Sequence, residues 1–100
     1  MKDNKILTTI RKKLHQQLPL LAKQYKVKTL AVFGSYVHHE QNTDSDLDLL
    51  VTFSETPGLL KFIKLENYLT DLLGTKVDLV MPSSLKPRIG QRILNEAVLI

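Results

Sequence analysis

Apolar residues recur at two different spacings along this 100-residue chain, and the spacing predicts which segments are helices and which are strands. Near the N-terminus the apolar side chains lie three and four residues apart, which is typical of one face of an α-helix: Ile6, Leu7, Ile10 and Leu14. Asp3 or Asn4 is placed to cap the start of this helix. Because Pro19 lacks a backbone donor, we expect a kink, or two helical pieces that end near Tyr25.

Three short apolar runs indicate buried strands at residues 28–33 (KTLAVF), 47–53 (LDLLVTF) and 76–81 (KVDLVM). The first run is closed by Gly34, a residue that commonly ends a regular element. Residues 98–100 can add a short edge strand. The strands are therefore expected to be separated by loops and helices along the chain.

Two further helices are expected between and after these strands. Thr56 is placed as an N-cap with Pro57 at the first helical position, and Gly74 ends this helix. Its predicted buried stripe consists of Leu59, Phe62, Ile63, Leu69, Leu72 and Leu73. Ser83 or Ser84 can cap a last helix that runs through Pro87, Ile89, Ile93 and Leu94. The order helix, strand, strand, helix, strand, helix predicts one α/β domain over residues 1–100.

The composition is that of an ordinary folded domain, with 43% hydrophobic and 24% charged residues. The absence of cysteine excludes disulfides and thiolate zinc sites. The N-terminal segment is charged throughout and shows no signal peptide or membrane-spanning run, so we expect a cytoplasmic protein with no membrane partner.

The net charge of +4 is unevenly distributed. Residues 1–33 carry eight basic and one acidic residue (+7), residues 34–80 carry three basic and eight acidic (−5), and residues 81–100 carry three basic and one acidic (+2). The basic segment has a charge suited to nucleic acid, but no aromatic residues interleave with its lysines as a stacking platform requires. A solvated helix face is the favoured interpretation.

Acidic residues interrupt two of the predicted strands. Asp46 and Asp48 point to the same side of their strand because side chains alternate between faces, and Asp78 stands between Val77 and Leu79 in the third strand. If the two strands are neighbours, three carboxylates gather in one place. Magnesium prefers such oxygen ligands and commonly joins protein carboxylates to a substrate phosphate. The acids therefore indicate phosphate chemistry.

Gly34 and Ser35 follow the first predicted strand and suggest a phosphate cradle. A glycine at this position lets backbone amides approach an anion, and the serine adds a hydroxyl donor. Alone, a Gly-Ser pair is more often an ordinary turn. Its spacing to the acids, Gly-Ser-x10-Asp-x-Asp, gives it a more specific meaning.

This spacing, with the apolar run LLVTF after the second aspartate and the later VDLV, resembles the DNA polymerase β-like nucleotidyltransferase superfamily. The chain length and the C-terminal LKPRIGQRILNEAVLI further resemble the minimal nucleotidyltransferases, the antitoxins paired with HEPN-domain toxins. The resemblance implies the nucleotidyltransferase fold, a small mixed sheet of three to four strands flanked by helices.

The resemblance also implies a role for each matching residue. Gly34 and Ser35 would hold the triphosphate of ATP, Asp46 and Asp48 would ligate magnesium ions, expected as a pair, and Asp78 would ligate one ion and assist deprotonation of the acceptor hydroxyl. Family members of this type transfer AMP from ATP to a tyrosine of the toxin. The implied function is a magnesium-dependent protein adenylyltransferase that acts as an antitoxin, with a HEPN toxin as partner and a hetero-oligomer as its assembly.

One departure from the family pattern keeps alternatives open. Many relatives carry an Arg-Gly pair where this chain has His38 and His39, followed by Glu40, and a neutral histidine attracts phosphate less than arginine does. A binding module that neutralises its partner by contact, without catalysis, is therefore one alternative. An aminoglycoside-type nucleotidyltransferase is another, although such enzymes normally need an additional domain to hold the acceptor.

The remaining polar residues have simpler interpretations beside the functional ones. Asp44 is expected to form a turn with Asn42, Thr43 and Ser45. Tyr36 can either stack on a nucleotide base or pack against the sheet. Lys76 is expected to be solvated rather than bound to phosphate. A solvated face is likewise favoured for the two basic residues of the last helix, over a basic surface for a partner or nucleotide: Arg88 and Arg92.

Overall fold

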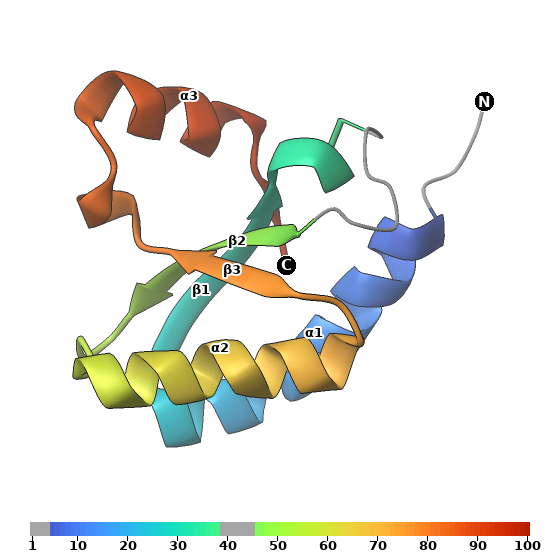
Figure 1. The fold of residues 1–100 in the computed structure, drawn as a ribbon, viewed down its shortest axis with the longest axis vertical. Helices are drawn as coiled ribbons and strands as arrows, with labels where there is room; N and C mark the ends of the chain where they lie inside the picture. Colours follow the sequence, from blue (N-terminus) through green and yellow to red (C-terminus); the bar gives the residue numbers. More distant parts are fainter. Residues whose placement is uncertain (1–4, 39–45) are drawn as a thin grey trace.

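The computed structural model describes residues 5–38 and 46–100, which form helices on both sides of a small sheet (Figure 1). The elements follow the order α1 (Lys5–Tyr25), β1 (Val27–Phe33), the 3₁₀ turn η1 (Gly34–Tyr36), β2 (Leu47–Phe53), α2 (Leu59–Leu73), β3 (Val77–Val80), the 3₁₀ turn η2 (Pro82–Ser84), α3 (Pro87–Glu96) and β4 (Val98–Leu99). This confirms the predicted α/β order. Among the described helices, none has the length and apolar character needed to span a membrane.

The sheet has the strand order β3-β2-β1-β4 and is mixed, as the resemblance implied. β1 runs antiparallel to both β2 and β4, whereas β2 and β3 are parallel and are connected through α2. The register places Phe33 of β1 beside Asp48 of β2, and Asp48 beside Asp78 of β3. The condition on which the gathering of the acids depended, that the second and third strands are neighbours, is therefore met.

The hydrophobic core lies between the sheet and the two long helices, α1 and α2, while α3 lies on the opposite face (Figure 1). The side chains that are fully buried in this layer are Leu14 and Leu21 of α1, Leu30 and Val32 of β1, Leu47, Leu49 and Val51 of β2, Leu65 and Leu69 of α2, and Val77 of β3. Burial of each such side chain contributes roughly 1.5–3 kcal/mol, so this layer fixes the orientation of β1, β2 and β3.

The first helix differs from the expectation of two pieces, because α1 is a single helix that contains Pro19. Leu14 and Leu21 are both fully buried, one on each side of the proline, so packing holds both halves against the same core. The proline itself is exposed. Burial on either side thus outweighs the lost backbone hydrogen bond. The predicted cap at Asp3 or Asn4 lies outside the described residues.

The start of the second helix was predicted wrongly. α2 begins at Leu59, and its N-cap is Gly58 with no side-chain cap, so Thr56 and Pro57 precede the helix. The stripe was also partly wrong, because Leu59 is 76% exposed and Ile63 is 41% exposed. The buried face is instead centred on Leu65 and Leu69, with Phe62, Leu72 and Leu73 partly buried beside them. Both mispredicted residues lie about a quarter turn or more from this centre.

The predicted end of α2 is confirmed, whereas the predicted cap of α3 is wrong. Gly74 ends α2 in the left-handed conformation, with φ of 69°, and its N–H donates to the Thr70 carbonyl at 2.9 Å, as predicted. The last helix begins at Pro87 after Lys86, so neither Ser83 nor Ser84 caps it. Both serines belong to η2, where the Ser84 hydroxyl donates to the Met81 carbonyl at 2.7 Å.

Candidate active site

The three predicted acids are positioned by β2 and β3. Leu47 and Leu49 are fully buried on the core face, so the alternation of β2 places the intervening Asp48 on the face that α3 partly covers. Its register partner on β3, Asp78, is exposed. Asp46 lies one residue before β2, with its side chain 44% exposed. The site therefore opens at the end of the sheet where β2 and β3 begin.

The charges of these acids act on one another. The pKa of Asp48 is raised above its ordinary value of 3.8, first because burial disfavours the charged carboxylate and then because Asp78 and Asp46 add negative charge nearby. The strand register pairs Asp48 with Asp78, and the negative charges of Asp46 and Asp78 both act on Asp48.

Gly34 lies directly against this group. It follows β1 with φ of +79°, a conformation that favours glycine, and a Cβ at this position would overlap the Asp48 carboxylate and lie 3.3 Å from its Cγ. The Gly34 carbonyl accepts hydrogen bonds from the N–H groups of Val37 at 3.0 Å and His38 at 3.3 Å. Ser35, half-buried, continues the same turn. The predicted cradle and the acids are thus brought together.

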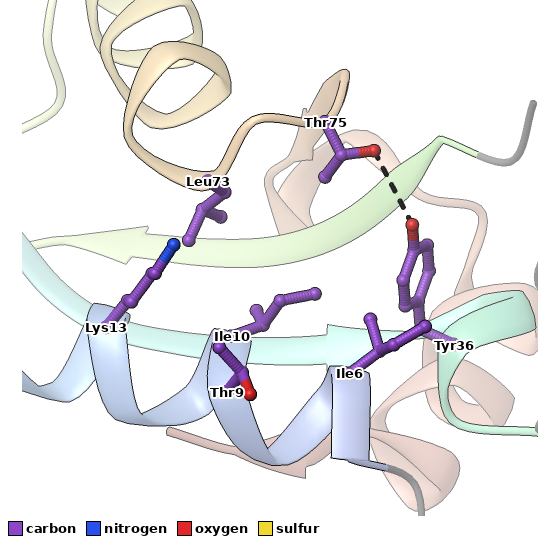
Figure 2. Close-up of a pocket in the computed structure, with 7 residues that line it drawn as sticks. All are labelled: Ile6, Thr9, Ile10, Lys13, Tyr36, Leu73 and Thr75. Carbon is purple, nitrogen blue, oxygen red and sulfur yellow. Dashed lines mark hydrogen bonds between the residues drawn. The ribbon is translucent and has the colours of Figure 1, made fainter. Parts of the chain in front are cut away.

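Tyr36 anchors the turn from the core side. Its side chain is 6% exposed, and its hydroxyl lies 3.5 Å from the Thr75 hydroxyl, as Figure 2 shows. The two residues border a pocket of about 290 Å³ whose other lining residues are Ile6, Thr9, Ile10, Lys13 and Leu73. Of the two predicted roles, packing against the sheet is confirmed, and stacking on a nucleotide base is wrong because the ring is buried.

Two polar contacts at the rim were not predicted from the sequence. Lys76, 77% exposed, lies 3.9 Å from the carboxylate of Asp46, so its expected solvated state is confirmed with a weak ion pair added. His38 lies 3.1 Å from Glu96 at the end of α3. These residues are far apart in the sequence, so no local pattern signals either contact. The predicted turn around Asp44, together with His39 and Glu40, lies outside the described residues.

The donor atoms fit a hard divalent cation, although they are not arranged as a finished site. Across residues 5–38 and 46–100, no three His, Asp or Glu side chains form a ready-made metal-binding group. Asp48 nevertheless sits half-buried between two further carboxylates, a concentration of negative charge that a cation would neutralise. Carboxylate oxygens are the ligand type that Mg²⁺ prefers.

A family model described as Polymerase beta, Nucleotidyltransferase matches residues 16–100, a range that includes the Gly34 turn and all three acids. The chain belongs to this nucleotidyltransferase family. Among the relatives of this nucleotidyltransferase, the protein adenylyltransferase MntA of Thermococcus cleftensis is 50% identical over 95 residues, covering 95% of this chain and 89% of the relative.

Solved structures confirm the nucleotidyltransferase fold. A candidate minimal nucleotidyltransferase is 40% identical, with a TM-score of 0.79, and covers 92% of this chain and 93% of its own. A chain of a mutant MntA-HpeT toxin-antitoxin structure is 26% identical, with a TM-score of 0.66 and coverage of 93% and 69%. A complex of an MNT antitoxin with a tri-AMPylated HEPN toxin from Shewanella oneidensis shows the fold alone, at 24% identity, a TM-score of 0.58 and coverage of 92% and 66%.

Proposed function

We propose that this nucleotidyltransferase is a Mg²⁺-dependent protein adenylyltransferase that transfers AMP from ATP to a partner protein. The observation that carries the proposal is the meeting of Gly34, Asp48 and Asp78 at adjacent strands, in a chain half identical to a named protein adenylyltransferase. Phosphoryl-type transfer depends mainly on positioning and charge neutralisation. A turn of backbone amides beside three carboxylates supplies both.

The proposed roles follow from these positions. The backbone amides of Gly34 and Ser35, with the serine hydroxyl, hold the triphosphate. Asp46, Asp48 and Asp78 would hold Mg²⁺, which when bound neutralises the phosphate oxygens and the developing charge. Because Gly34 has no side chain, the turn that would hold the triphosphate can pack directly against the Asp48 carboxylate. Tyr36, buried in the core and 3.5 Å from the Thr75 hydroxyl, would hold the turn in place.

The transfer is an in-line substitution at the α-phosphorus of ATP. A hydroxyl oxygen of the partner forms the new bond to that phosphorus, the bond from phosphorus to the bridging oxygen of the β-phosphate breaks, and pyrophosphate leaves. The hydroxyl proton passes to Asp78, whose exposed position on the edge strand makes it accessible to an incoming protein.

The partner proposed is a HEPN-domain toxin, and the accepting hydroxyl is that of a tyrosine. A toxin-antitoxin structure of MntA and HpeT, one chain of which is 26% identical to this one, supports this choice, and the fold is shared with a chain of the complex that contains the tri-AMPylated Shewanella oneidensis HEPN toxin. The antitoxin activity would be exercised in the cytoplasm, where ATP is available, and the pair would form a hetero-oligomer.

Mass spectrometry of the partner tests the proposal. The purified chain is incubated with ATP, Mg²⁺ and a HEPN-domain protein, which we expect to be encoded beside its gene, and the partner is expected to gain the mass of one or more AMP groups. Asp48→Asn should abolish the gain, and the exposed-site control Asp71→Asn on α2 should retain it. An unmodified partner, with both proteins folded, would contradict the proposal, as would full transfer by Asp48→Asn.

Neutralisation by contact is the second candidate, and it is motivated by His38 and His39, which stand where many relatives carry an Arg-Gly pair. It predicts that a non-transferring variant such as Asp48→Asn still forms a complex that suppresses the toxin. Measuring the activity of the toxin with this variant separates the two functions. Loss of suppression assigns the function to catalysis.

A further inference from the structure

Few residues of the last helix, α3, are buried, although the helix borders the site. Within this helix, all of whose residues are described, Gly90 alone is buried. Leu94 and the following Ala97 face the sheet, because they line a pocket of about 170 Å³ with Ala31 and Leu50. The other flank of the helix is therefore exposed, including Ile89 at 49%.

This exposed flank is continuous with the cradle. Residues 89, 92 and 96 lie three and four positions apart, so their side chains follow one flank of α3. At its end, Glu96 lies 3.1 Å from His38, and the His38 N–H donates to the carbonyl of Gly34. A molecule that lies along this flank therefore reaches the turn that borders Asp48.

The charge of this flank indicates which kind of protein surface can bind to it. Arg92 is 83% exposed and lies 4.0 Å from the opposite carboxylate oxygen of Glu96, while Arg88, one turn earlier, is also exposed. With Lys86, three cations face one anion on this segment. Two arginines beside an exposed isoleucine match a protein surface that carries both acidic and apolar side chains.

We infer that the exposed flank of α3 that carries Arg88, Ile89 and Arg92 and ends at Glu96, called here the α3 flank, docks an acidic, partly apolar surface of the protein that accepts AMP. This inference rests on the proposed function and adds the partner-binding surface to it. The α3 flank holds the partner so that its acceptor segment lies over the acids. A second exposed surface on α2, which carries Leu60, Lys61 and Lys64, starts at the opposite end of β2 and takes no part in docking.

Steady-state kinetics of AMP transfer to the neighbour-encoded HEPN-domain protein distinguish the two surfaces. The test variant is Arg88→Gln combined with Arg92→Gln, and the matched control is Lys61→Gln combined with Lys64→Gln, which removes the same charge from α2. The α3 variant is expected to raise the KM for the partner about tenfold, with the Kd for Mg²⁺·ATP unchanged. Ile89→Ser should raise the same KM, whereas Leu60→Ser should not.

The dependence of the partner KM on ionic strength tests the inference independently. The KM of the wild-type chain and of the α2 variant should rise with ionic strength more steeply than that of the α3 variant, because the docking charges have been removed from the latter.

Each other outcome overturns the inference. An unchanged KM in the α3 variant shows that the partner docks elsewhere, and a weaker Kd for Mg²⁺·ATP shows that the arginines bind nucleotide. If the α3 variant changes the KM for the partner only when RNA is present as a competitor, the α3 flank binds nucleic acid instead. In all three cases transfer by the wild-type chain continues, whereas failure of the proposed function would leave the partner unmodified by every variant.

Discussion

Replacing Gly34 with alanine tests the contact between the cradle and the acids. The substitution has two effects, because φ is +79° at this position and because the new Cβ would overlap the Asp48 carboxylate. Gly74 provides a matched control, since it also has a positive φ, of +69°, but has nothing within 4 Å of a built Cβ. Comparing the two alanine variants separates backbone strain from the collision with Asp48.

The expected magnitudes follow from this difference. Left-handed backbone costs a non-glycine residue roughly 1–2 kcal/mol, so Gly74→Ala should lower the free energy of unfolding by about that amount. For a domain of this size, each kcal/mol lowers Tm by about 4–8 °C. Gly34→Ala carries the same strain and must also displace the carboxylate or the turn, so its loss of stability should be larger.

Transfer activity is compared at a temperature where both variants are folded, as checked by circular dichroism. Gly74→Ala should retain AMP transfer within about twofold, whereas Gly34→Ala should lose at least about tenfold, equivalent to roughly 1.4 kcal/mol of transition-state stabilisation. If Gly34→Ala transfers AMP as well as Gly74→Ala does, the close approach of the cradle to Asp48 has no catalytic importance and the reasoning is refuted.

Two further predictions concern stability. Leu65→Ala should lower the free energy of unfolding by about 2–5 kcal/mol, whereas Leu59→Ala should change it by no more than about 0.5 kcal/mol. Urea denaturation measures both values. A larger loss for Leu59→Ala than for Leu65→Ala would contradict the assigned buried face of α2. The raised pKa of Asp48 means that the folded state binds a proton more readily than the unfolded state, so this residue lowers stability as the pH rises above 3.8. Without Mg²⁺, Asp48→Asn should therefore be more stable than the wild type at neutral pH, and the difference should shrink in acid; a destabilised variant at neutral pH would contradict this sign.

The strands and the cradle were predictable because their signals are local. The apolar run at residues 47–53 predicted the bounds of β2, and the spacing from Gly34 to Asp46 and Asp48 identified the family. The position of Asp78 beside Asp48 also followed, once the two strands were taken as neighbours. Local periodicity and a fixed motif thus defined the centre of the candidate site.

The features that escaped prediction depend on tertiary packing. Pro19 stays within one helix because the core holds both halves of α1, and this balance is invisible in the local sequence. The exposure of Leu59 depends on where α2 meets the sheet. The contact between His38 and Glu96 joins residues 58 positions apart. Such contacts fix the rim of the site, and only the folded chain shows them.

The central claim is that the turn at Gly34 and the acids on β2 and β3 form one nucleotide site that requires Mg²⁺. The most direct test is an NMR titration of the labelled chain with AMP-PNP, in the presence and absence of Mg²⁺. The account predicts Mg²⁺-dependent amide shifts concentrated at residues 34–36 and at Asp48 and Asp78, which are lost in Asp48→Asn. Shifts that are independent of Mg²⁺, or that are centred on the pocket between α1 and Thr75, would contradict it.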